Sequence, residues 1–155
     1  MAQENLHHKI NEDLRTATKQ KDATVVRVLR FCKSILDSAA KDLLKPELSD
    51  EEAIKVISKK IKQSREAAEA FKAGNRQELV QAEEEEVEIL IKYLPKQLSE
   101  DELNAIVLEI VTETGANSAK DFGKVMGAVM RKVAGKADGA TVKQAVERNL
   151  QQEKK

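Results

Sequence analysis

A glycine-rich basic segment near the C-terminal end carries the residues best suited to binding chemistry. It contains Gly123, Gly127, Gly135 and Gly139, four of the six glycines in the chain. Gly123 and Gly127 are four residues apart, so on a helix they share a face and permit close approach of another molecule or backbone. Each glycine inside a helix is unfavourable by roughly 1 kcal/mol relative to alanine. Two explanations are open: tight packing between helices, or a surface that RNA phosphates approach.

Basic side chains surround these glycines. From Lys120 to Lys143 the sequence holds six basic and two acidic residues, a local excess of +4, although the whole chain carries 27 of each sign. The acidic counterweight is the run Glu83–Glu86 together with Glu88. Overall neutrality argues against a globally cationic nucleic-acid binder, whereas the polarised distribution is compatible with a local anion site. The cations that flank the glycines are Lys124, Arg131, Lys132 and Lys136.

The stretch from Gly135 to Gly139 has the pattern of a connection between two helices. Gly135 suits the left-handed position that follows a helix end, and Asp138 suits the N-cap of the next helix. Lys136 would then lie beside the positive N-terminal end of the last helix. These two positive features together favour an anion such as a phosphate.

No complete catalytic or metal site can be read from the sequence. The only histidines, His7 and His8, are adjacent, so a helix would point them about 100° apart, and we expect both on the solvated surface. The single cysteine, Cys32, lies on an apolar helical face and is expected in the core. Phosphate-loop, dinucleotide-binding and serine-hydrolase motifs do not occur. We therefore expect no catalytic residue, metal or cofactor.

Other basic bands and the few aromatic residues are given an ordinary structural interpretation. The bands are Arg27, Arg30 and Lys33 on the second predicted helix and Lys55, Lys59, Lys60 and Lys62 on the third. Acidic residues are interleaved with them, which favours solvated faces. The aromatic residues are Phe31, Phe71, Tyr93 and Phe122, and we expect most of them in the core. Any RNA would then be bound by shape and phosphate contact rather than by base stacking.

Composition indicates a small globular protein. The chain has 155 residues, of which 41% are hydrophobic and 35% charged, enough for one domain or two small ones. One cysteine fits a reducing compartment. No apolar run approaches the roughly 18 residues of a membrane span, and the first residues lack the apolar core of a signal peptide. We expect a soluble cytoplasmic protein without membrane association.

Stretches with helical spacing of apolar residues alternate along the chain with residues that typically begin or end a helix. Asp22, Ser49, Ser99 and Ser118 are predicted N-caps, and Ser49 and Ser99 each precede a glutamate in a capping box. No segment shows sustained period-2 alternation, so the predicted fold is all-α. We expect about four longer helices in a domain over residues 1–95, the first near 3–20, and three short helices in a domain over 96–155. Pro95 marks the boundary.

Three motifs give the sequence a resemblance to the YqeY family. They are K-D-A-T-V-V-R-V-L-R at 21–30, Y-L-P-K-Q-L-S-E-D-E-L at 93–103 and G-K-V-M-G-A-V-M-R-K-V-A-G-K-A-D-G at 123–139. The resemblance extends from about Leu6 to Leu150. The C-terminal part is also similar to the tail domain of the B subunit of the glutamine-dependent aspartyl/glutamyl-tRNA amidotransferase.

The resemblance implies a partner and a set of site residues. In the amidotransferase the tail domain contacts tRNA, and similar modules fused to glutaminyl-tRNA synthetases aid tRNA binding. Family transfer also implies a carbon–nitrogen ligase label with glutamine as amido-N-donor. The catalytic cradle of that ligase has no counterpart here. Carried onto this sequence, the tRNA-facing residues lie around Gly123 and Gly127 and are Lys124, Arg131, Lys132, Gly135, Lys136 and Lys143.

Three functional hypotheses follow. The first is a free-standing tRNA-binding accessory module that assists amidotransfer or aminoacylation, without a complete active site of its own. The second is a protein–protein adaptor that docks on an amidotransferase or an aminoacyl-tRNA synthetase. The third is an enzyme that forms carbon–nitrogen bonds, which would have to consume ATP and glutamine by itself. The sequence leaves the oligomeric state open.

Overall fold

The computed structural model describes residues 5–152, and every regular element in that range is helical. This confirms the all-α prediction. The helices are α1 (Leu6–Gln20), α2 (Ala23–Asp42), α3 (Asp50–Ala73), α4 (Gln77–Ile91), α5 (Glu100–Thr114), the short 3-10 helix η1 (Ala119–Asp121), α6 (Phe122–Val133) and α7 (Gly139–Gln152). The chain divides into two compact units, Met1–Leu94 and Pro95–Lys155. Residues 3 and 4, which the prediction placed in the first helix, lie outside the described range.

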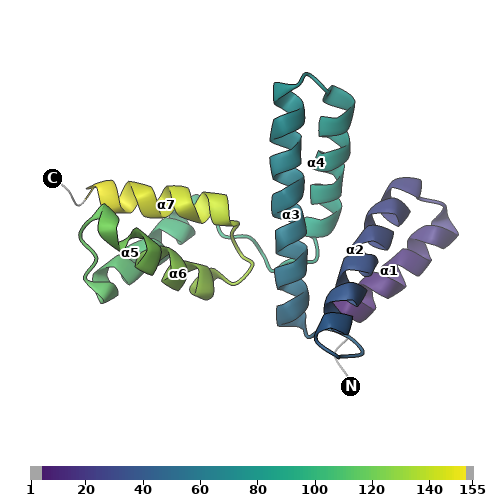
Figure 1. Cartoon of the computed structure of the whole chain (residues 1–155), viewed down its shortest axis with the longest axis horizontal. Coiled ribbons are helices and arrows are strands. Elements are labelled where there is room, and N and C mark those ends of the chain that lie inside the picture. Colours follow the sequence, from purple (N-terminus) through teal and green to yellow (C-terminus); the bar gives the residue numbers. More distant parts are fainter. Residues whose placement is uncertain (1–4, 153–155) are drawn as a thin grey trace. The chain divides into compact units, whose positions relative to one another are not determined.

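The N-terminal unit consists of two helical hairpins. Helix α1 lies along α2, and α3 lies along α4 (Figure 1). Apolar side chains from all four helices form one core, and packing of their apolar faces supplies most of the stability of the helices. The residues of this core are Ile10, Val28, Leu29, Cys32, Leu36, Ala40, Leu48, Ala53, Ile57, Ile61 and Leu90.

The predicted caps explain where several of these helices begin. Asp22 accepts the Val25 amide hydrogen at the start of α2, and Ser49 forms a complete capping box with Glu52 at the start of α3. At the end of α3 the left-handed residue is an asparagine rather than a glycine. Gly74 has an ordinary φ of −90°, and the following Asn75 takes the left-handed conformation with φ 58°. Asparagine tolerates that conformation because its short polar side chain can bond locally.

The prediction that His7 is solvated is wrong. His7 is 2% exposed, because it lies three residues before Ile10 on the buried face of α1. Its Nε2 is 2.8 Å from Asp37 Oδ1 on α2, and its Nδ1 accepts the Leu48 amide hydrogen at 3.0 Å. His8 is exposed, as predicted. A buried imidazole with both nitrogens hydrogen-bonded is a structural link between α1, α2 and the start of α3.

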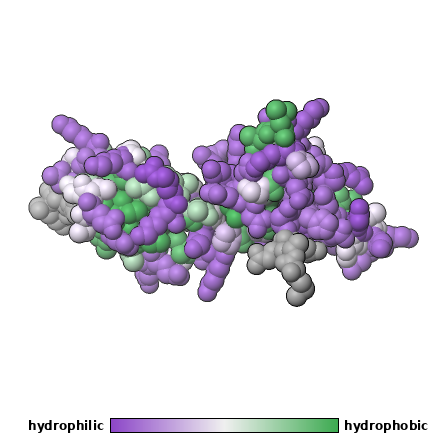
Figure 2. Space-filling model, turned by 90° about the horizontal axis from the view of Figure 1, so that it is seen from below, coloured by the Kyte–Doolittle hydropathy of each residue, from purple (hydrophilic) through white to green (hydrophobic). Residues whose placement is uncertain are grey.

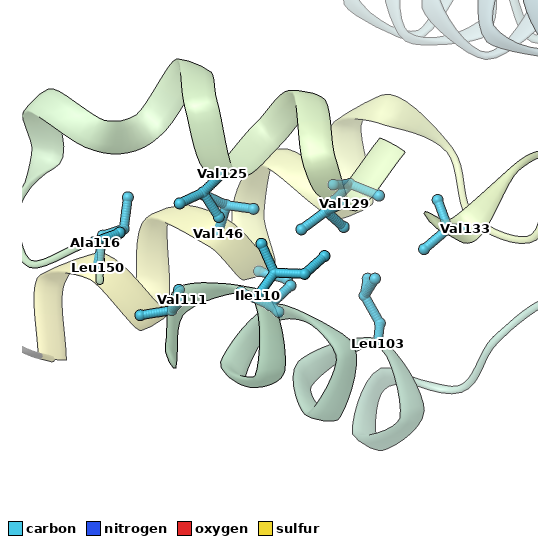
Figure 3. Packing of buried hydrophobic residues seen from close by; sticks show 12 residues of the cluster. Leu103, Ile110, Val111, Ala116, Val125, Val129, Val133, Val146 and Leu150 are labelled. Carbon is cyan, nitrogen blue, oxygen red and sulfur yellow. The ribbon is translucent and has the colours of Figure 1, made fainter. Parts of the chain in front are cut away.

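The C-terminal unit is a three-helix arrangement around a valine-rich core. Leu103, Ile110 and Val111 of α5, Val125, Val129 and Val133 of α6, and Val146 and Leu150 of α7 point toward one another (Figure 3). Ser99 and Glu102 form the second predicted capping box, and Gly115 ends α5 in the left-handed conformation. Ser118 caps η1 rather than a longer helix, so α6 begins at Phe122.

Candidate nucleic-acid interface

The candidate glycines lie on the face of α6 that points away from the core. Val125, Val129 and Val133 are completely buried and define the inner face of this helix. Helical geometry places Gly123 and Gly127 opposite them, and Gly123 is exposed while Gly127 is partly exposed. The glycine pair therefore opens the α6 backbone to the outside of the C-terminal unit.

Neither glycine is needed for packing inside the unit. A Cβ atom added at Gly123 would have no other atom within 4 Å, and one at Gly127 would meet only Arg131 Nη1, at an ordinary 3.8 Å. Both positions also lack the positive φ that would favour glycine. The structure thus removes tight helix packing, the first of the two explanations for this pair. Close approach of a molecule from outside the chain remains.

Lys124 and Arg131 share the outer face of α6 with the two glycines. They are seven residues apart, about two helical turns, and both side chains are exposed. Within the residues that the structure describes, neither forms an ion pair. The structure therefore brings together a glycine pair and two cations on one helix face.

Lys132 occupies a different position. It lies on the flank of α6 toward α5, where its Nζ is 2.9 Å from Glu109 Oε1. Hydrogen bonding to Glu109 raises the pKa of Lys132, and the same contact lowers the pKa of Glu109. This cation can meet an outside anion only in competition with a carboxylate of its own chain.

The connector after α6 has the predicted conformation. Ala134 and Gly135 both have positive φ, 35° and 84°, and Asp138 Oδ1 accepts the Thr141 amide hydrogen at 2.7 Å at the start of α7. Lys136 and Lys143 are exposed, one in the connector and one on α7, and form no ion pair with any part of the chain that the structure describes. The candidate cations are thus spread over α6, the connector and α7.

Sequence reasoning missed the segment that holds this connector. Gln97 Nε2 donates to the Gly135 carbonyl oxygen at 2.9 Å, and the Leu98 amide donates to the Lys136 carbonyl oxygen at 2.8 Å. The Lys136 amide in turn donates to the Val133 carbonyl oxygen at 2.8 Å. These bonds fix the backbone that carries Lys136. No sequence signal announces them, since the partners are 38 residues apart.

Other kinds of site find little support in the described residues. Over residues 5–152 no group of three or more histidine, cysteine, aspartate or glutamate side chains is placed to hold a metal ion. None of the described helices combines the length and apolarity needed to cross a bilayer. Cys32 is completely buried, and that burial, with the nearby Glu86 carboxylate, raises the pKa of its thiol to about 12. It is therefore a protonated core residue rather than a nucleophile.

Comparison with known proteins places the chain in a family. A family model described as YqeY-like protein matches residues 7–150. The chain belongs to the YqeY family. The match extends over both units of this YqeY chain and includes α6, the connector and most of α7, so the candidate interface lies inside the region that defines the family.

Two fungal proteins are similar to this YqeY chain. A protein of Pyrenophora tritici-repentis named altered inheritance of mitochondria protein 41, mitochondrial, is 29% identical over 134 residues, which are 83% of this chain and 71% of that protein. An uncharacterized protein of Schizosaccharomyces pombe is 30% identical over 95 residues, 61% of this chain and 76% of that protein.

Proposed function

We propose that this YqeY chain binds structured RNA, with tRNA as the candidate ligand, through the outer face of α6 and the connector that follows. One observation carries the proposal: Gly123 and Gly127 open the helix backbone on a face that also presents Lys124 and Arg131. Two glycines weaken a helix and give no packing in return within the unit. Close approach of a phosphate backbone explains why glycine occupies both positions.

Phosphate binding follows from the chemistry of this face. Without Cβ atoms at two stacked positions, a phosphodiester can come close to the helix while the Lys124 ammonium and the Arg131 guanidinium neutralise its charge. Lys136 and Lys143 extend the basic surface beyond α6, and Lys136 lies just before the positive end of α7. Such binding positions an RNA by its backbone and does not read its bases.

The wider role proposed for the module is that of an accessory in amidotransfer or aminoacylation. That part rests on the resemblance of the C-terminal unit to an amidotransferase tail domain. On this view the carbon–nitrogen ligase label describes the system that the module serves. Docking as an adaptor on an amidotransferase or a synthetase is the alternative, and it predicts negligible affinity for RNA alone.

The direct test is a fluorescence-anisotropy titration of labelled bulk tRNA at low and near-physiological salt, with unstructured RNA of equal length as competitor. The informative variant is Lys124→Glu with Arg131→Glu. Neither residue forms an ion pair within the described chain, so a change in tRNA affinity cannot come from breaking one. The matched control is Lys19→Glu with Lys41→Glu, the same charge change on exposed residues of the N-terminal unit.

Tight, salt-sensitive and tRNA-preferring binding that falls at least ten-fold in the α6 variant supports the proposal. Each lost phosphate contact should also reduce the slope of log affinity against log salt by about one. Equal affinities in the α6 variant and the control would move the site away from this face. Absence of binding at low salt would favour the adaptor alternative.

A further inference from the structure

Phe31 is the most exposed aromatic residue of the chain, since Phe71, Tyr93 and Phe122 are all half-buried. Tyr93 and Phe122 pack against the two cores, whereas Phe31 is 49% exposed on α2. The expectation that most aromatic residues lie in the core is met by Tyr93 and Phe122 only. Its ring borders a small open cavity of about 180 Å³ in the N-terminal unit, lined by Arg27, Val28, Phe31, Lys60 and Glu86.

The ring is held in place by a charged neighbour. Lys60 Nζ on α3 lies 4.7 Å from the ring centroid of Phe31, within the range of a cation–π contact. Lys60 is fixed in turn by Glu86 on α4, with Nζ and Oε1 3.4 Å apart and both side chains largely buried. The Phe31 ring thus has a cation against one face, while about half of the residue stays accessible.

One unpaired cation lines the cavity beside the ring, and a second lies on the adjacent face of α2. Arg27 is one helical turn before Phe31 and lines the same cavity, and Arg30 is its exposed chain neighbour. Neither forms an ion pair with any of the described residues. By contrast, Lys33 is engaged with Asp37. The local charge is therefore one neutralised pair, Lys60 with Glu86, and two arginines available to an outside anion.

We propose that Phe31 is a stacking site for an unpaired base of RNA, with Arg27 contacting the neighbouring phosphate. Every nucleobase has a π-face, and aromatic side chains next to arginines bind single-stranded nucleotides in this way. The surroundings fit a nucleotide better than a protein partner, because Phe31 is isolated among the exposed polar residues Arg27, Arg30 and Ser34. Figure 2 shows one face of the molecule, which is mostly hydrophilic with smaller hydrophobic patches. A protein interface would need a contiguous apolar centre.

This site lies in the N-terminal unit, outside the α6 face. It rests on the proposed function only in that both take RNA as the ligand. It gives the module a preference that backbone contacts cannot supply: a structured RNA with an unpaired, accessible base, as in a loop or at an end.

The test uses the full chain and a short single-stranded oligonucleotide that contains 2-aminopurine, whose fluorescence is quenched when the base stacks. Phe31→Leu removes the ring but keeps an apolar side chain, and Phe31→Tyr keeps the ring as the matched control. Wild type and Phe31→Tyr are expected to quench the probe. Phe31→Leu should lose the quenching and bind about five-fold or more weakly, as the loss of one stacked base implies. Circular dichroism and thermal unfolding check that each variant is folded.

A second background separates this site from the α6 face. In Lys124→Glu with Arg131→Glu, quenching of the oligonucleotide should persist while tRNA affinity falls. Quenching that is equal in wild type and Phe31→Leu overturns the stacking site and leaves the tRNA proposal intact. Quenching by the wild type without any tRNA binding overturns the tRNA proposal and leaves the stacking site intact. If the oligonucleotide does not bind even at low salt, the stacking site is overturned.

Discussion

Lys132 Nζ lies 2.9 Å from Glu109 Oε1, so a cation of the glycine-rich helix is bound to a carboxylate of the neighbouring helix α5. The pair is exposed to solvent, so it contributes little to stability. Its larger consequence is electrostatic: Glu109 is a negative charge at the edge of the surface proposed to receive phosphates.

Replacing Glu109→Gln should therefore raise tRNA affinity by a few-fold at low salt, since a repelling charge is removed and Lys132 is released. The effect should shrink as salt is added. Glu100→Gln is the matched control, because it breaks a similar exposed pair with Arg148 in the same unit. Equal gains in tRNA affinity in Glu109→Gln and Glu100→Gln would mean that only the net charge matters and that the release of Lys132 does not contribute.

For the two glycines of α6 we predict opposite effects of substitution on stability and on binding. Gly123→Ala and Gly127→Ala should each raise the free energy of unfolding, by up to about 1 kcal/mol, because alanine favours the helix and its Cβ meets no obstacle. Both should weaken tRNA binding, and Gly127→Leu should weaken it further. Denaturant unfolding and anisotropy measure the two effects on the same samples.

Gly115→Ala is the control for this pair. Gly115 has φ 69°, where a side chain is strained, so this change should lower stability by about 1 kcal/mol and leave tRNA affinity unchanged. A loss of stability in the α6 alanine variants would restore a packing role for those glycines. Greater stability with unchanged affinity would separate them from RNA binding.

The buried His7 predicts a specific loss of stability. In His7→Phe the amide of Leu48 loses its acceptor and Asp37 loses a donor, so the free energy of unfolding should fall by about 1–3 kcal/mol. The same change at the exposed His8 should stay within about 0.5 kcal/mol. Similar results for both variants in chemical denaturation would contradict the bridging role of His7.

The low pKa of Glu52 predicts part of the loss of folding stability in acid. Its hydrogen bond from Lys45, and those from Ser49, lower the pKa of the carboxyl from 4.5 to about 2. Since the folded-state pKa is the lower one, the stabilising contribution is fully present above pH 4.5 and is lost as the pH falls through about 2. The stability gap between wild type and Glu52→Gln should therefore close over that interval. A gap that is constant with pH would show that the capping box does not depend on ionisation.

Cys32 provides a probe of unfolding. Because burial raises its pKa from 9.0 to about 12, the folded chain should react with a thiol reagent only through opening of the N-terminal unit. Labelling at pH 8 should then accelerate in His7→Phe in proportion to the lost stability. Because the folded-state pKa is the higher one, the protonated thiol contributes its full stability below pH 9, and this contribution is lost as the pH rises toward about 12. Fast labelling in native buffer would indicate an open core.

Local chemistry explains why much of the fold could be predicted from the sequence. The capping boxes at Ser49 and Ser99, the cap at Asp22 and the left-handed Gly135 involve residues within a few positions of one another. Such contacts are encoded by spacing alone. The valine stripe of α6 likewise follows from helical periodicity. Helices that follow one another in the sequence are joined by short connections, and such helices usually pack together.

Contacts between distant residues were decided only by tertiary structure. Residue types and spacing predicted the cations of the candidate site. Packing against α5 then paired Lys132 with Glu109 and left Lys124 and Arg131 on the outer face of α6. Packing also placed His7 beside Asp37 and Phe31 beside Lys60. These outcomes depend on which flank of a helix meets which neighbour. A single helical period determines the inner face of a helix but not what lies at its edges.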